Sequence, residues 1–149
     1  GEDIALLSIG TRLAACLDAA EKLAADGVKI TVADARFAKP LDTGLLAELA
    51  QNHKYLLIVE EGSPGGFAAH AINYLANQGH LDDGCRVRSV TLPDMFIDHD
   101  SQEGQLADAG LDAAGILHSL HSLDSLDSLR TVAGLDKKSP AKAGKAGAK

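Results

Sequence analysis

Apolar and polar residues alternate along the chain in blocks that predict strands and helices in turn. Short apolar runs at residues 4–9, 28–33 and 55–59 are bounded by turn residues, as expected for strands buried on both faces. Residues 86–92 alternate more strictly, which predicts an edge strand with one face in water. A segment of helical spacing follows each run, so the pattern predicts an α/β fold with a mainly parallel sheet and right-handed crossovers.

The predicted helices begin at polar residues that can cap them. Thr11 is the expected N-cap of a helix over residues 12–26, Asp42 of a helix reaching about residue 51, and Asp112 of the last helix. Two further helices are expected over residues 65–78 and 102–109. In the first helix the predicted apolar face consists of Leu13, Cys16, Leu17, Ala20, Leu23 and Ala24.

The pattern changes near residue 117, where Leu recurs at every third position through Leu129. On an α-helix, residues spaced three apart shift around the axis by about 60° from one Leu to the next, so this stripe cannot stay on one face. Residues 1–120 are therefore expected to form the domain, and residues 121–149 a low-complexity Leu/Ser repeat with a disordered basic tail. The abrupt start in a strand suggests a piece cut from a longer protein.

The charge is unevenly distributed. Of the formal net charge of −7, residues 134–149 contribute +4 from five Lys and one Asp, so the rest of the chain carries −11. An acidic body argues against binding to nucleic acid, which requires clustered Lys and Arg. No apolar run approaches a membrane span, and there is no secretion signal, so no membrane partner and a cytoplasmic location are expected. Cys16 and Cys85 are expected to be buried free thiols.

The most informative stretch is residues 55–66, YLLIVEEGSPGG. Its carboxylates and glycines follow a buried strand, at the edge of an open α/β sheet where ligands and partners usually bind. The end of the first strand should lie at the same edge. The interface or cleft candidates are therefore Gly10, Thr11, Glu60, Glu61, Gly62, Gly65 and Gly66.

Each of these features has two interpretations. Glu60 and Glu61 are adjacent in an extended strand, so their side chains point to opposite faces. They either bind a cofactor or a partner subunit, or they cap nearby helix N-termini. The capping interpretation is favoured. The glycine loop matches neither GxGxxG nor GxxxxGK[ST], so a structural turn is favoured over an anion site. Asp98, His99 and Asp100 offer metal-ligand types, but consecutive residues rarely converge on one ion. We expect no catalytic residue, no bound cofactor and no metal site in this chain.

Five ordered motifs resemble the C-terminal domain of the 1-deoxy-D-xylulose-5-phosphate synthases, in the thiamine-diphosphate transketolase superfamily. They are SIGT at residues 8–11, DARFAKPLD at 34–42, VEEGSPGGFA at 59–68, LPDMFIDHD at 92–100 and ADAGLDAAGI at 107–116. The second and third are shared across the superfamily, whereas the last two point to the synthases. This chain departs from them in having Phe67, Ala68 and Ala69 where relatives often have further glycine.

The resemblance implies a three-layer sandwich whose five-stranded, mainly parallel sheet has helices on both faces. It implies a homodimeric transferase that joins the two-carbon unit of pyruvate to glyceraldehyde 3-phosphate. Thiamine diphosphate and Mg²⁺ would be bound by two preceding domains, because the family's GDG…N motif does not occur here. Two alternatives stay open: a stand-alone small-ligand module using the strand-end cleft, and the C-terminal domain of another two-carbon-transferring enzyme.

Overall fold

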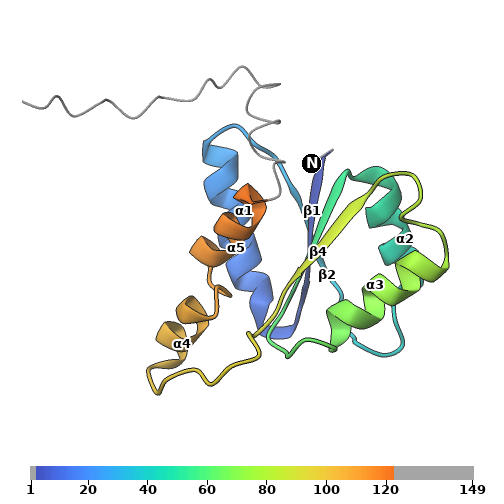
Figure 1. Cartoon of the computed structure of the whole chain (residues 1–149). Helices are drawn as coiled ribbons and strands as arrows, with labels where there is room; N and C mark the ends of the chain where they lie inside the picture. Colours follow the sequence, from blue (N-terminus) through green and yellow to red (C-terminus); the bar gives the residue numbers. More distant parts are fainter. Residues whose placement is uncertain (1–2, 123–149) are drawn as a thin grey trace, which may run out of the picture.

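A parallel β-sheet forms the centre of the computed structural model, which describes residues 3–122 (Figure 1). Within these residues the sheet has four strands in the order β2-β1-β3-β4. They are β1 (Ile4–Ile9), β2 (Thr31–Asp34), β3 (Tyr55–Glu60) and β4 (Arg86–Val90), and every pairing is parallel. The predicted α/β class is confirmed, and β4 is an edge strand as expected. The fifth strand implied by the resemblance is not among residues 3–122.

Helices cover both faces of the sheet. The helices α1 (Leu13–Ala25), α4 (Gln102–Asp108) and α5 (Ala113–His121) lie on one face, and α2 (Thr43–Asn52) and α3 (Phe67–Asn77) lie on the other (Figure 1). Strand residues alternate between these layers, so that Leu6 packs toward α1 and α5 while Leu7 packs toward α2 and α3. Full burial of each such Leu stabilises the fold by about 1.5–3 kcal/mol.

The helix caps follow the predictions at two of three positions. Asp42 accepts the Leu45 N–H at 2.9 Å, and Asp112 accepts the Gly115 N–H at 2.7 Å. The prediction for Thr11 was wrong, because a 3₁₀ turn over Gly10–Arg12 precedes α1 and the Thr11 hydroxyl donates to another group.

The predicted start of the second strand was also wrong. The Val28 N–H donates to the Leu23 carbonyl at 2.9 Å and thereby closes the end of α1, so β2 begins only at Thr31.

The face of α1 that packs inward differs from the prediction. Its buried residues are Cys16, Ala19 and Leu23, whereas Leu17 is 51% exposed. The helix is rich in Ala, and its rotation is set by packing against α5. Residues 123–149, which include most of the Leu/Ser repeat and the basic tail, lie outside the described part of the chain. Among residues 3–122, no helix has the length and apolar character needed to cross a membrane.

Candidate functional site

A shallow hollow of about 350 Å³ lies at the carboxyl edge of the sheet, between the ends of β1 and β3. It is lined by Ile9, Gly10, Thr11, Glu60, Glu61, Gly62 and Phe67. Five of the seven predicted interface or cleft residues therefore meet in one place. The other two, Gly65 and Gly66, lie in the turn between this hollow and α3.

Glu60 is a buried carboxylate, only 4% exposed, at the last position of β3. Its Oε2 accepts the backbone N–H of Ala68, in the first turn of α3. The first N–H groups of a helix have no partner within the helix, and its positive dipole end favours an anion. Glu60 thus caps α3 from outside the helix, which is the capping interpretation favoured from the sequence.

The glycines leave room for this carboxylate. A Cβ on Gly62 or on Gly66 would fall on Glu60 Oε1, so any larger residue at either position would displace the buried acid. Gly65 and Gly10 adopt φ values of +98° and +68°, which side chains disfavour. The glycine loop is therefore a turn shaped around a protein carboxylate, whose charge would repel a phosphate.

Glu61 faces the first helix. Its Oε2 accepts a hydrogen bond from the Thr11 hydroxyl at 2.5 Å and pairs with Arg12 Nη2 at 3.3 Å. Arg12 is buried, with 9% of its side chain exposed, and its Nη1 donates to the Leu111 carbonyl at 3.2 Å. One guanidinium therefore joins the start of α1, the end of β3 and the loop before α5.

The model of the family described as "Transketolase, C-terminal domain" matches residues 1–116. The chain belongs to the transketolase C-terminal domain family. This agrees with the fold and with the motifs at the ends of β1, β2 and β3.

Solved transketolases share this fold. The domain is similar to the inactive β4 tetramer of a split gene transketolase, with 26% identity and a TM-score of 0.73 over 85% of this chain. It also resembles transketolase from Campylobacter jejuni, with 16% identity and a TM-score of 0.54 over 81% of this chain. The chain spans 40% and 17% of the lengths of those two chains.

The hollow of this transketolase C-terminal domain is a poor fit for thiamine diphosphate and Mg²⁺. Two carboxylates line it and would repel a diphosphate, while the Arg12 guanidinium is already engaged by Glu61 and Leu111. Across residues 3–122, His, Cys, Asp and Glu side chains do not gather in threes that could hold a metal ion.

Arg12 was not among the residues predicted for this site. Helical spacing alone could have indicated it, because residues 12, 16, 19 and 23 recur on one face of a helix, and the structure buries all four. An arginine on such a stripe must find partners for its charge inside the fold. The predicted apolar face was instead assigned to the larger Leu13 and Leu17, which hid this pattern.

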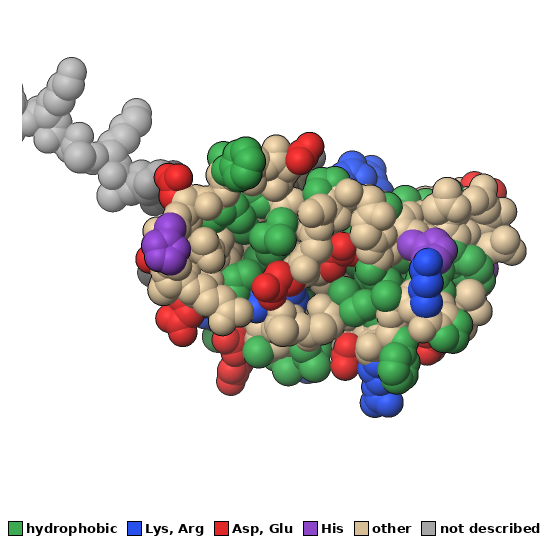
Figure 2. All heavy atoms as spheres, turned by 90° about the horizontal axis from the view of Figure 1, so that it is seen from below, with side chains coloured by type: hydrophobic (Ala, Val, Ile, Leu, Met, Phe, Trp, Pro, Cys, Tyr) green, Lys and Arg blue, Asp and Glu red, His purple; other side chains and the backbone are tan. Residues whose placement is uncertain are grey.

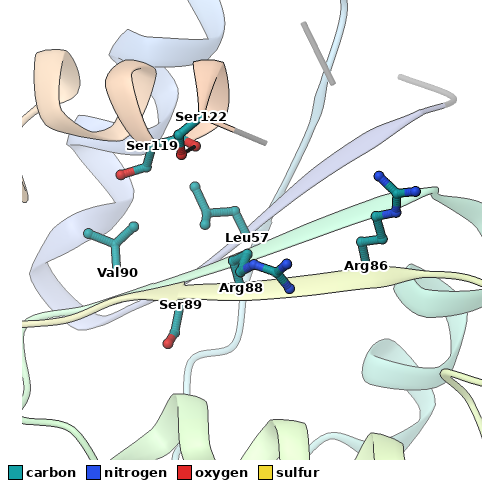
Figure 3. A pocket seen from close by; sticks show the side chains of 7 residues that line it. All are labelled: Leu57, Arg86, Arg88, Ser89, Val90, Ser119 and Ser122. Atoms are coloured by element: carbon teal, nitrogen blue, oxygen red, sulfur yellow. Dashed lines mark hydrogen bonds between the residues drawn. The ribbon is translucent and has the colours of Figure 1, made fainter. Parts of the chain in front are cut away.

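A second hollow, of about 300 Å³, lies between β4 and the last turn of α5 (Figure 3). Ser119 and Ser122 lie above Leu57 and Val90, while Ser89 points to the other side of the sheet (Figure 3). Arg86 stacks over the Tyr55 ring at 5.7 Å, and Arg88 donates to the Val87 carbonyl at 2.8 Å. Both arginines of this hollow therefore have a contact within the domain.

Proposed function

We propose that this chain is the non-catalytic C-terminal domain of a 1-deoxy-D-xylulose-5-phosphate synthase, where it supports the fold and the assembly of a dimer. Membership of the transketolase C-terminal domain family supports the domain type. The LPDMFIDHD and ADAGLDAAGI motifs, whose resemblance is to the synthases, support the finer assignment.

The observation that carries the architectural role is that both acids at the hollow are engaged within the domain. Glu60 holds the Ala68 N–H, and Glu61 holds Thr11 and Arg12. A carboxylate that acts as a general base or nucleophile must direct an oxygen at its substrate, whereas the Oε2 atoms of these two acids are directed at partners within the domain. Because both carboxylates bind groups of the domain itself, we infer that this edge of the sheet has a structural role and contacts another part of the enzyme.

The parent enzyme would condense pyruvate with glyceraldehyde 3-phosphate, with loss of CO₂, in isoprenoid precursor and thiamine biosynthesis. Thiamine diphosphate and Mg²⁺ would supply the carbanion chemistry of that reaction, and we expect them to be held by preceding domains of the parent enzyme. The partners of the domain would be those thiamine-binding domains and a second subunit in a cytoplasmic homodimer.

A second candidate is the C-terminal domain of another transketolase-type enzyme, which the likeness to a split gene transketolase favours. The third is a stand-alone module that binds a small ligand in the strand-end hollow, which is open and about 350 Å³ in volume. Reading the gene upstream of residue 1 separates them. A thiamine-binding region there supports either enzyme, and a start codon supports the module.

The decisive experiment compares the full gene product with the 149-residue chain. With thiamine diphosphate, Mg²⁺, pyruvate and glyceraldehyde 3-phosphate, we expect turnover from the full product and none from the chain alone. Turnover only with a ketose donor and an aldose acceptor would assign the transketolase alternative instead. Turnover by the chain alone would overturn the non-catalytic role.

The role of the hollow is tested by Glu60→Ala and Glu61→Ala in the full gene product, using sedimentation and steady-state kinetics. We expect weaker assembly or lower stability, with kcat at saturating cofactor close to that of the unmodified protein. A variant that remains a stable dimer but loses kcat by orders of magnitude would place a carboxylate in the chemistry.

A further inference from the structure

The carboxyl edge of the sheet displays large apolar side chains that the domain does not bury. Among residues 3–122, Phe37, Met95 and Phe96 are 68%, 70% and 100% exposed. Burial of such a side chain is worth about 1.5–3 kcal/mol, which these residues forgo in the isolated domain. Apolar surface bordered by polar residues is typical of a protein–protein contact.

These residues follow the two outer strands of the sheet along the chain. Phe37 follows β2 and Met95 and Phe96 follow β4, which are the two outer strands, whereas the hollow follows the central strands β1 and β3. With strands about 4.8 Å apart, the four strand ends span about 14 Å. Figure 2 shows the molecule from below, the side toward which the strands run in Figure 1, and apolar and acidic side chains lie next to one another on it.

Hydrogen bonds hold the segments that carry these residues. The Leu92 N–H donates to the Gly62 carbonyl at 2.9 Å, and the Gln105 side-chain amide donates to the Asp98 carbonyl at 3.1 Å, so the loop carrying Met95 and Phe96 is fixed at both ends. On the other side, the Ala35 N–H donates to the Ser8 carbonyl at 2.9 Å. The next residue, Arg36, has φ +59°, an uncommon conformation for a residue other than glycine, and its N–H donates to Asp34 Oδ1 at 3.0 Å.

The charges near Phe96 define the complementary surface. Asp94, Asp98 and Asp100 are exposed and lie within four residues of it in the sequence, and residues 92–101 contain no Lys or Arg. A partner with an apolar recess bordered by Lys or Arg matches this arrangement, whereas an acidic surface would be repelled.

We propose that Phe37 and the Met95–Phe96 pair are the two apolar anchors by which this domain docks on the thiamine-binding part of its parent enzyme. The inference rests on the proposed function, which supplies the occupant. The related split gene transketolase fits this, because the present chain spans only 40% of that chain and leaves further protein against which a domain can pack. The recess that receives Phe96 is apolar and bordered by basic side chains.

Oxidation of side chains measures this contact directly, and Met95 is the single methionine of the chain. The full gene product and the 149-residue chain are exposed to hydroxyl radicals, and the oxidation of Met95, Phe96, Phe37 and Leu17 is followed by peptide mass spectrometry. We expect the three anchor residues to oxidise at least fivefold more slowly in the full product. Leu17, on the outer side of α1, is the matched control and should oxidise equally in both.

Two results would overturn the proposal. One is equal oxidation of the anchors in both proteins. The other is protection in the 149-residue chain that increases with its concentration, which would identify a second copy of this domain as the occupant.

Substitutions supply an independent test in the full gene product. Phe96→Ser should weaken association or domain docking at least tenfold, measured by sedimentation and by protease sensitivity, while Leu17→Ser should leave both unchanged. Equal behaviour of the two variants contradicts the anchor role. If the proposed function is wrong, the unmodified full gene product will show no thiamine-dependent turnover. Protection of Met95 is measured independently of turnover, so the two failures can be told apart.

Discussion

Gly66 lies against the Glu60 carboxylate so closely that a Cβ on this glycine would fall on Glu60 Oε1. The contact joins the end of β3 to the start of α3, because the same carboxylate accepts the Ala68 N–H. The acid and the glycine are therefore one structural unit, and neither can be replaced without affecting the other.

The first prediction concerns this unit. Gly66→Ala should lower the free energy of unfolding by about 1–3 kcal/mol, because the methyl group displaces a buried, hydrogen-bonded carboxylate. Gly44→Ala is the control, since its Cβ meets only Asp42 Oδ1 at 3.6 Å within α2, and alanine there should stabilise by about 0.5–1 kcal/mol. Urea denaturation of both variants checks the opposite signs.

A double-mutant cycle identifies the cause of this cost. In a Glu60→Ala background, Gly66→Ala should cost much less, because the displaced oxygens are no longer there. An unchanged cost would show that the damage arises elsewhere in the turn.

The second prediction concerns Arg12 and Glu61. Arg12→Met should lower the free energy of unfolding by about 2–4 kcal/mol, because the buried Leu111 carbonyl loses its donor and Glu61 keeps only the Thr11 hydroxyl. Glu61→Gln should cost about 1 kcal/mol, because its carboxylate is 34% exposed and keeps a hydrogen-bond acceptor.

The pair of Asp3 and Lys54 is the matched control, because its Lys54 side chain is 76% exposed. Lys54→Met should leave the denaturation midpoint close to that of the unmodified chain. Equal effects of Arg12→Met and Lys54→Met would contradict the structural role of Arg12.

The third prediction follows from Cys16. Burial raises the pKa of this thiol from 9.0 to about 12, against the opposing charge of Arg12. Because the folded-state pKa lies above the unfolded one, the thiol's contribution to stability is full below about pH 9 and is lost as the pH rises toward about 12. In that window the loss approaches about 1.4 kcal/mol per pH unit.

Across this alkaline range, the free energy of unfolding should therefore fall more steeply with pH for the unmodified chain than for Cys16→Ala. Cys85→Ala is the control and should retain the steep fall. In thiol titration of the folded chain, the half-buried Cys85 should react well before Cys16. If the stability of the unmodified chain and of Cys16→Ala fell equally with pH, the pH dependence could not be attributed to the Cys16 thiol.

The fourth prediction tests the end of the domain. Leu120 is fully buried in the layer that contains α1 and α5, so Leu120→Ala should cost about 2–4 kcal/mol. Leu17→Ala, at a residue that is 51% exposed, should change stability by no more than about 0.5 kcal/mol. Thermal denaturation compares them, and similar shifts would mean that α5 does not complete the core.

Much of the site was accessible from the sequence. Parallel strands place their carboxyl ends at one edge, so the meeting of Gly10 and Thr11 with Glu60 and Glu61 followed from the order of the elements. The partner of each carboxylate could not be assigned in this way. That choice depends on which helix N-terminus and which guanidinium the packed layers bring within about 3 Å of the acid.

The sequence alone determined the alternation of strands and helices, the buried character of β1 and β3, and the Asp42 and Asp112 caps, because these depend on spacing and on neighbours within one turn. Only the tertiary structure decided that Arg12 is buried and Leu17 exposed, and that β2 starts at Thr31. An Ala-rich helix has several faces of similar apolar character. Its rotation is therefore set by the shape of α5 and by the carbonyl and carboxylate that satisfy Arg12, both distant in the sequence.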